Sequence, residues 1–298
     1  MIVSRITSCC AAAALAWAAA ASAGVVYECN FESAAGTQDG AAITGVTGGT
    51  AVIAHPGNDA QATVTIPTAP LAGESHGLRV AMIDGNLKRP AGVTFIPADA
   101  SHSLNVWFTD ANAPGNTTGQ HQLNGSMDFF IRINKPLTDW DQLRILNCSH
   151  DHRVKDRGIQ FVLTNIVGAD LRLDFAVQGE DDKGQPLPHA ELPPTFTLKP
   201  DVIYHIAITL STNDRGETTS RLYVKEGVGK INTRAPALAN GIVVFKKFNL
   251  DEKLVKTGLF PGAFTFGPCN PSKAAGFVYD IARVRIYDDI PEVFDALP

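Results

Sequence analysis

Two observations predict that this chain folds as an all-β protein, an antiparallel sandwich or jelly roll. The stretch Asp201–Gly229 contains two segments of alternating apolar and polar residues joined by a polar turn, the pattern of a β-hairpin with one buried face. Elsewhere the chain has many short segments of this kind and no long segment with helical periodicity. A hairpin with one apolar face needs a second sheet to cover it, so two layers are expected.

The hairpin divides its residues cleanly between two faces. The first strand is expected at Val202–Leu210, where the even-numbered residues are apolar and share one face. The turn is expected at Ser211–Thr219, which is rich in Asn, Asp, Gly, Ser and Thr. The second strand is expected at Arg221–Lys225. His205 and Tyr223 then fall on the face opposite the apolar residues.

Other segments extend the same pattern through the chain. Ser126–Ile133 alternates most clearly, whereas Glu32–Gly77 alternates only weakly and is expected to form irregular edge strands and loops. We find no internal repeat and no linker, so residues 24–298 are expected to form one domain. The remaining expected strands are Val25–Phe31, Leu78–Ile83, Gly92–Ile96, Leu104–Phe108, Leu143–Leu146, Ile159–Leu163, Leu171–Val177, Ile242–Phe245, Ala263–Phe266 and Gly276–Tyr287.

The first 23 residues have the pattern of a secretory signal peptide. Arg5 precedes an Ala-rich apolar run, which ends in the cleavage-type sequence Ala21-Ser22-Ala23. The run is too short to span a membrane, and no later segment approaches that length. Cys9 precedes the run, which argues against a lipid anchor. We therefore expect a secreted or periplasmic protein, and the Ala-rich leader is typical of bacterial export.

The net charge argues against nucleic acid as a partner. The formal charge is −5, and it becomes −6 when Arg5 is removed with the leader. A mildly acidic chain without basic runs lacks the positive surface that binds phosphate backbones.

Three cysteines follow the leader, namely Cys29, Cys148 and Cys269. An odd number in an exported protein predicts one disulfide and one leftover thiol, or three buried thiols. We favour Cys29 with Cys269, because each lies near a chain end and the terminal strands of a jelly roll commonly neighbour each other. The other two pairings remain open.

Three motifs resemble the laminin-G-like, concanavalin A-like jelly-roll family. They are GSMDFFIRI, the hairpin YHIAITLSTNDRGETTSRLYVKEG and the closing strand FTFGPCNPSKAAGFVYDIARVRIYDDI, and together they cover about Ser126–Asp289. The sequence departs from the family at Lys225-Glu226-Gly227, where an Asn-Gly turn is usual. The resemblance implies an exported protein that binds glycans or proteins, often with calcium near the sandwich edge. Related jelly rolls include glycoside hydrolases and polysaccharide lyases, and fold alone does not choose among these.

Asp280 in the closing strand is the most informative carboxylate. Strict alternation would place it on an inward face, and a buried carboxylate must be paired or bound to a metal. A structural calcium ion is one hypothesis, with Glu32 as a second ligand. The alternative is a salt bridge or hydrogen bonds to loop amides. The residues expected on the same face as Asp280 are Val278, Ala282, Val284 and Ile286.

A catalytic hypothesis rests on the polar faces of the predicted strands. In a lyase acting on an acidic polysaccharide, Arg or Gln would neutralise the uronate carboxylate, and His or Tyr would abstract the neighbouring proton. His205 and Tyr223 would take the second role, and Arg144 and Gln160 the first. Against this, the resemblance implies that non-catalytic relatives also carry His and Tyr at these hairpin positions. The alternating carboxylates of a retaining glycoside hydrolase are absent from the sequence.

The leading functional hypothesis is a secreted module that binds extracellular or cell-surface carbohydrate, with Arg132, Arg172 and Trp140 as ligand-binding candidates. Trp107, Trp140 and Tyr279 are candidates for stacking on sugar rings, although core packing is the commoner role of such residues. The first alternative is a polysaccharide lyase or related glycan-active enzyme at a concave sheet. The second is a module that binds a protein partner.

Overall fold

The structure is a computed structural model. It describes residues 23–36, 38, 40–54, 62–65, 71, 77–82, 92–97, 125–135, 142–147, 158–165, 171–178, 190–191, 196–213, 217–244, 264–269 and 278–298. Residues 1–22 of the expected leader and the expected strand Leu104–Phe108 lie outside these ranges.

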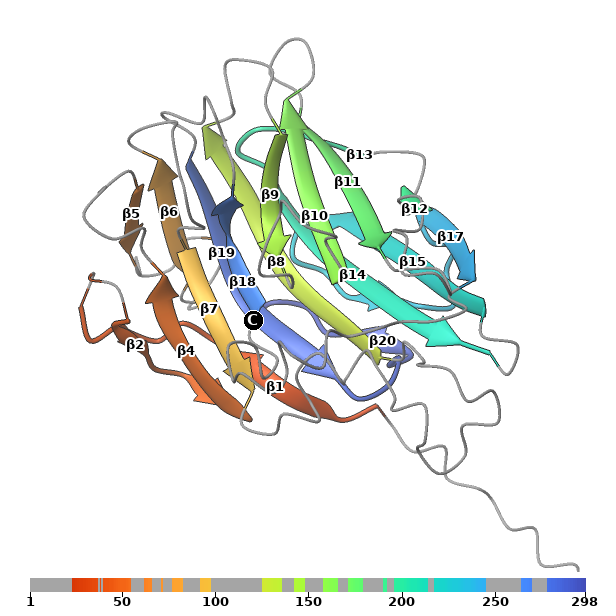
Figure 1. Ribbon diagram of the computed structural model, residues 1–298, viewed down its shortest axis with the longest axis horizontal. Helices are drawn as coiled ribbons and strands as arrows, with labels where there is room; N and C mark the ends of the chain where they lie inside the picture. The colour runs from red at the N-terminus through yellow and green to blue at the C-terminus, as the bar shows by residue number, and fades with distance from the viewer. Residues whose placement is uncertain are drawn as a thin grey trace, which may run out of the picture.

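The described residues form two large antiparallel sheets and a small two-stranded one (Figure 1). The strands of the two large sheets, in spatial order, are as follows. The first sheet contains β17 (Ala239–Val244), β15 (Glu217–Glu226), β14 (Ile203–Thr212), β8 (Gly125–Lys135), β19 (Val278–Tyr287), β1 (Val25–Cys29) and β3 (Val46–Thr47), with β6 (Leu78–Met82) beside β19 and β5 (Ala62–Thr65) beside β6. The second sheet contains β12 (Ala190–Glu191), β11 (Leu171–Gln178), β10 (Gly158–Asn165), β9 (Gln142–Asn147), β18 (Phe264–Cys269), β7 (Gly92–Pro97), β4 (Gly49–Ala54) and β2 (Ala42–Ile43), with β13 (Phe196–Leu198) beside β11.

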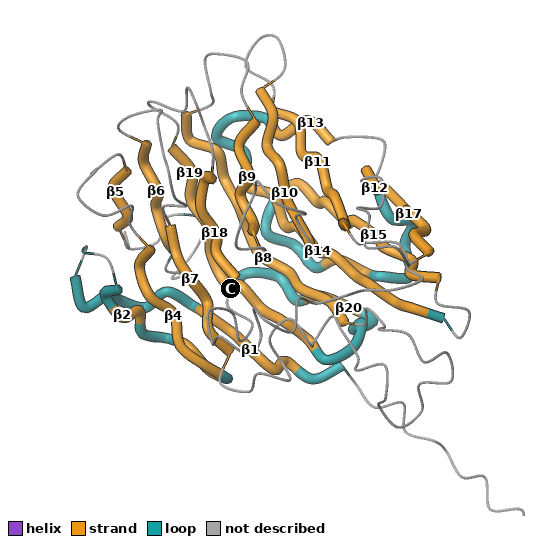
Figure 2. Tube along the Cα trace, viewed as in Figure 1, coloured by secondary structure: helices purple, strands orange, loops and turns teal. Residues whose placement is uncertain are grey.

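The all-β sandwich predicted from the sequence is confirmed. Every strand pair in the described ranges is antiparallel, from the hairpin β14–β15 to the distant pair β1–β19. Figure 2 shows strands and loops only, and the described residues contain no helix. Accordingly, the described part of the chain has no helix of the length and apolarity needed to cross a membrane.

The inner face of the first sheet meets the second sheet through aromatic side chains. Tyr27 of β1 and Phe31 just beyond it both contact Phe95 of β7 edge to face, at centroid distances of 5.9 and 6.0 Å. Tyr27 pairs with Ile286, and the inward face continues across β8 to the even-numbered residues of β14. The alternation predicted for the hairpin is confirmed, because Tyr204, Ile206, Ile208 and Leu210 are all buried.

The outer face of the first sheet is also covered. A covering layer, residues 227–238 and 288–298, carries β16 (Ile231–Asn232) and β20 (Val293–Phe294), which pair with each other. Ile231 and Phe294 pack against Ala207, Tyr223 and Tyr287, and Leu297 packs against Phe130 and Ala282. The middle of the first sheet is therefore buried on both faces.

A β-bulge in β19 changes which residues face outward. Ala282 pairs with Phe130 and Arg285 with Asp128, so two residues of β19 lie opposite one residue of β8. Arg283, within the bulge, has a φ of 38°. The inward face predicted for Asp280 is therefore wrong, because Asp280 shares the outer face with Ala282, which packs against the covering layer. The bulge turns two of the expected neighbours of Asp280 to the opposite, inner face, namely Val284 and Ile286.

The predicted disulfide between Cys29 and Cys269 is wrong. Cys29 is a free, buried thiol in β1 of the first sheet, whereas Cys269 ends β18 of the second sheet. Burial is the main cause that raises the pKa of Cys29 to about 12, so the thiol is unreactive in the folded protein. Cys148 lies outside the described residues.

Candidate functional site

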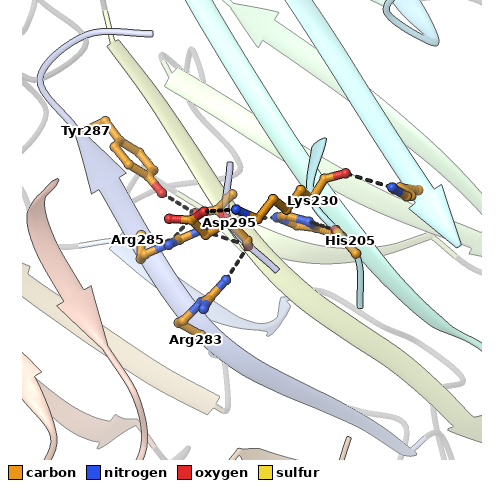
Figure 3. A network of polar contacts seen from close by, with 9 residues as sticks. His205, Lys230, Arg283, Arg285, Tyr287 and Asp295 are labelled. Atoms are coloured by element: carbon orange, nitrogen blue, oxygen red, sulfur yellow. Dashed lines mark hydrogen bonds and ion pairs between the residues drawn. The ribbon is translucent and has the colours of Figure 1, made fainter. Parts of the chain in front are cut away.

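A buried network of polar side chains centres on Asp128 of β8. Figure 3 shows His205, Arg285 and Tyr287 of this network, with Arg283 beside them. Four hydrogen bonds converge on the Asp128 carboxylate. Arg285 donates from Nε to Oδ1 at 2.9 Å and from Nη2 to Oδ2. Tyr287 Oη donates to Oδ1 at 3.2 Å, and His205 Nε2 lies 2.8 Å from Oδ2. Four contacts fill the lone-pair sites of one carboxylate, so Asp128 is fully satisfied although it is completely buried.

The strand register brings these residues together. Asp128 pairs with Ala207 of β14 on one side and with Arg285 of β19 on the other. His205 lies two residues before Ala207 and therefore shares its face, as Tyr287 shares the face of Arg285. Three strands from distant parts of the sequence thus contribute to one outward patch beneath the covering layer.

The electrostatics of the patch favour the ionised forms of both Asp128 and Arg285. Burial alone would raise the pKa of Asp128, but hydrogen bonds from His205 and Arg285 outweigh it and hold that pKa below its usual value. Burial and then the Asp128 charge raise the pKa of Tyr287, so its hydroxyl stays protonated and donates. The site is a charged cluster held without water contact.

The network also binds the covering layer through main-chain carbonyls. His205 Nδ1 lies 2.8 Å from the Gly229 oxygen. Arg283 Nη2 donates to the Asp295 oxygen, and Arg285 Nη2 contacts the same atom at 3.3 Å. Tyr223 Oη donates to the Thr233 oxygen at 3.1 Å. Side chains of the sheet therefore hold the covering layer at several points.

His205 and Tyr223 do lie on the face opposite the apolar residues, as the alternation predicted, but that face is not an open groove. His205 is 0% exposed and Tyr223 is 5% exposed, and both polar groups are engaged as described above. A general base must reach the proton that it removes. The catalytic interpretation of His205 and Tyr223 needed an accessible face, so the structure does not support it.

Asp280 is paired with cations rather than placed for a metal ion. Arg79 donates from Nε to Oδ1 at 2.7 Å and from Nη2 to Oδ2 at 3.0 Å. Arg132 Nη2 and Asn134 Nδ2 each donate to Oδ2 at 2.8 Å. Burial would raise the pKa of Asp280, but these hydrogen bonds, led by that from Arg79, hold it below its usual value.

This donor set does not fit the calcium site predicted at Asp280 and Glu32. Two guanidinium groups already neutralise the carboxylate and would repel a divalent cation. Glu32 is exposed, and its side chain lies against Gly45. The described residues hold no group of three or more His, Cys, Asp or Glu that could bind a metal. The salt bridge that was the alternative interpretation is the arrangement at Asp280.

The other predicted site residues are divided between the sheets. Arg132 belongs to the first sheet, where it contacts Asp280, whereas Arg144, Gln160 and Arg172 belong to β9, β10 and β11 of the second. Tyr279 is completely buried in the core, so it is no sugar platform. The predicted aromatic residues Trp107 and Trp140 lie outside the described residues.

Asp128, Arg283 and Arg285 were missed as site residues. A signal was present in the sequence. Asp128 is a lone carboxylate in the apolar strand GSMDFFIRI, and the two arginines interrupt the closing strand DIARVRIY. Charges of opposite sign on two strands that each have an apolar face can pair only if the strands are neighbours, and pairing is what a buried charge requires.

Comparison with known proteins gives only distant likenesses. No family model matches the chain, and no curated protein matches it. A carbohydrate esterase from the Shiga toxin-encoding bacteriophage phi24B has 8% identity and a TM-score of 0.41, covering 90% of this chain and 100% of the other. A marine alginate lyase from Aplysia kurodai has 11% identity and a TM-score of 0.40, covering 75% and 86%. The CBM2 module of the evolved Dit protein of Lactobacillus casei BL23 phage J-1 has 11% identity and a TM-score of 0.33, covering 93% and 98%. Likeness at this level carries no inference about ligand or reaction.

Proposed function

We propose that this protein is an extracellular carbohydrate-binding or adhesion module, and that glycan contacts the second sheet. The observation that carries the proposal is the burial of His205 and Tyr223 beneath the covering layer. It removes the two groups that the lyase alternative needed for proton abstraction. It also removes the middle of the outer face of the first sheet as a binding surface.

The polar residues that remain for ligand binding belong to the second sheet. Gln160 of β10 is two residues from Val162, which pairs with Arg144, and four residues from Thr164, which pairs with Arg172. Paired positions and alternate positions share one face of a sheet. The register therefore gathers Arg144, Gln160 and Arg172 on one face of three adjacent strands.

Such a group suits an acidic glycan. The fork of an arginine matches a carboxylate or sulfate, and two forks on the strands that flank β10 match a repeating anionic polymer. Glutamine donates to and accepts from sugar hydroxyls. In this proposal Arg144 and Arg172 bind acidic groups and Gln160 orients a sugar ring.

Affinity electrophoresis tests the proposal. The protein is run through gels containing alginate, pectate, glucuronan or a glycosaminoglycan, with a neutral glucan as a reference. We expect retardation by at least one acidic polymer, and we expect Arg144→Ala/Arg172→Ala to lower the affinity about tenfold or more.

A matched control removes the same charge on the side of the first sheet. Arg221→Ala/Arg234→Ala takes away two exposed arginines and should leave retardation unchanged. Equal losses in the two double variants would mean nonspecific attraction and would contradict the second-sheet site. If no polymer retards the protein, glycan binding is rejected, and a protein partner becomes the working hypothesis.

The lyase alternative is checked on the same polymers by ultraviolet absorbance of unsaturated uronate. We expect none. If product forms and Tyr223→Phe forms it equally well, the protein is an enzyme whose active site lies away from the Asp128 network.

A further inference from the structure

His205 has two hydrogen-bond partners, and both can only accept. Its Nδ1 lies 2.8 Å from the main-chain oxygen of Gly229, and its Nε2 lies 2.8 Å from Oδ2 of Asp128. A carbonyl oxygen has no proton to give. An ionised carboxylate has none either. The side chain is 0% exposed, so water cannot replace either partner.

A neutral ring cannot satisfy this arrangement. If only Nδ1 carried a proton, the Nε2 lone pair would face a carboxylate oxygen at hydrogen-bond distance. If only Nε2 carried it, the Nδ1 lone pair would face the Gly229 oxygen in the same way. A protonated Asp128 could donate to the ring, but Arg285 binds both oxygens of that carboxylate and favours its charged form.

Some groups around the His205 ring favour a positive charge on it, and others oppose that charge. The face of Phe130 stacks on His205 at a centroid distance of 4.1 Å, and an aromatic face attracts a cation. Arg283 lies over Phe130, and Arg285 is bound to Asp128, so two arginines oppose an added positive charge. Among the described residues, other charged groups on this side of the sheet include Glu28 of β1, which pairs with Arg285, Lys225 of β15, and Lys230 and Asp295 of the covering layer. The direct contacts of the two ring nitrogens outweigh these groups and favour the charged ring. In either neutral tautomer, one buried nitrogen lone pair would face an oxygen that can only accept.

We propose that His205 is doubly protonated in the folded protein and acts as a proton-dependent latch between the first sheet and the covering layer. The ring joins Asp128 of β8 to Gly229 of the covering layer only while it carries both protons. When the ring loses one proton, the remaining N–H stays with the Asp128 carboxylate, since that hydrogen bond is charge-assisted. Gly229 then loses its donor.

The sign of the pH effect follows from this. The folded state needs the proton, so the contribution of the latch is present at low pH and is lost as the pH rises and the ring deprotonates. The covering layer loosens first where it depends on the latch, around Gly229 and the neighbouring hydrogen bond from Leu297 N to the Val228 oxygen, at 3.0 Å.

Nuclear magnetic resonance of the intact, nitrogen-labelled protein tests the protonation state directly. At neutral pH we expect both ring nitrogens of His205, assigned by their loss in His205→Gln, to show protonated shifts. The ring signals of the other seven histidines, recorded in the same sample, serve as a comparison. An unprotonated shift at either nitrogen of His205 overturns the proposal, and this measurement does not depend on whether a variant folds.

Amide hydrogen exchange tests the latch. Corrected for intrinsic rates, protection of Leu297 should fall about tenfold or more as the pH is raised, whereas amides within β14 keep theirs. Tyr223→Phe is the matched control, because it removes a non-titrating hydrogen bond to the same layer at Thr233. It should lower protection equally at every pH. A pH-independent Leu297 in the native protein, or a pH step that survives in His205→Gln, contradicts the latch.

Discussion

Asp128 shows at the scale of one residue how the protein tolerates buried charge. Its carboxylate is completely buried, and Arg285, Tyr287 and His205 supply all of its hydrogen bonds. Such a cluster adds little stability compared with apolar packing, but removing one member leaves the others buried and unpaired. Substituting one such residue therefore lowers the free energy of unfolding by more than the intact cluster contributes to it.

Asp128→Asn should destabilise the protein by about 3–5 kcal/mol, because Arg285 loses its counter-charge in a buried site. Urea unfolding measures the change in the free energy of unfolding. Asp295→Asn is the matched control. The Asp295 side chain is 63% exposed in its pair with Lys230, and its main-chain oxygen is kept, so the cost should be about 0–1 kcal/mol. Equal costs in the two variants would show that Asp128 is not the centre of the network.

Asp280 predicts how the protein responds to acid. Its pKa and that of Asp128 lie below their usual values in the folded state, so the unfolded chain binds more protons as the pH falls. The stability that they contribute is complete above the unfolded carboxyl pKa of about 4 and is lost as the pH falls through the folded pKa values.

Thermal unfolding as a function of pH measures this effect. Asp280→Asn should lower the melting temperature at neutral pH and flatten its fall in acid, because the side chain that pairs with Arg79 and Arg132 is then uncharged and does not titrate. If the melting temperature of the variant falls in acid as steeply as that of the native protein, Asp280 does not contribute to the acid sensitivity.

At the scale of elements, departures from regular strands place the key residues. The bulge in β19 puts Arg285 and Tyr287 on the outer side with Asp128, the same side that Asp280 and Ala282 occupy before the bulge. A regular strand would turn one of these two pairs to the inner face. The positive φ of Arg283 is a strained conformation that the surrounding pairs hold in place.

Two glycines near β3 and β4 allow the cost of backbone strain to be measured separately from the cost of a steric collision. Gly48 (φ 72°) and Gly40 (φ 77°) both lie in the left-handed region. A Cβ on Gly48 would lie 2.0 Å from the main-chain oxygen of Val26 in β1, whereas a Cβ on Gly40 has nothing within 4 Å. Gly40→Ala should cost about 1–2 kcal/mol from strain alone.

Gly48→Ala should cost at least about 2 kcal/mol more than Gly40→Ala, because the contact between β1 and the β3–β4 turn must open. Chemical denaturation of both variants measures the difference. Similar costs would mean that the backbone near Val26 yields easily.

At the scale of the whole molecule, the free thiol of Cys29 predicts that β1 is held without a disulfide. Cys29 should resist alkylation in the folded protein, because it is buried and its pKa is raised to about 12. After unfolding without reductant it should be alkylated completely, as peptide mass analysis measures. Labelling that requires a reductant would show that Cys29 is bonded after all.

The sequence by itself determined the sandwich and most of its strands. Alternation in β8, β14 and β15 reports burial of one face, which is a local property that neighbouring residues record. It also placed His205 and Tyr223 correctly on the opposite face. Asp280 was expected to be buried and paired or metal-bound, because the chemistry of a buried carboxylate allows little else.

Only the tertiary structure decided what covers that opposite face and which charges meet there. Ile231, Phe294 and Leu297 belong to short segments without clear periodicity, so no local pattern predicts that they pack on the outer face of the first sheet. The bulge at Arg283 shifts the face of every later residue in β19, and it is defined only against β8. Asp128, His205 and Arg285 are far apart along the chain, and strand order, register and the bulge together bring them within hydrogen-bond distance. Periodicity describes each strand, whereas the pairing of strands is a long-range property.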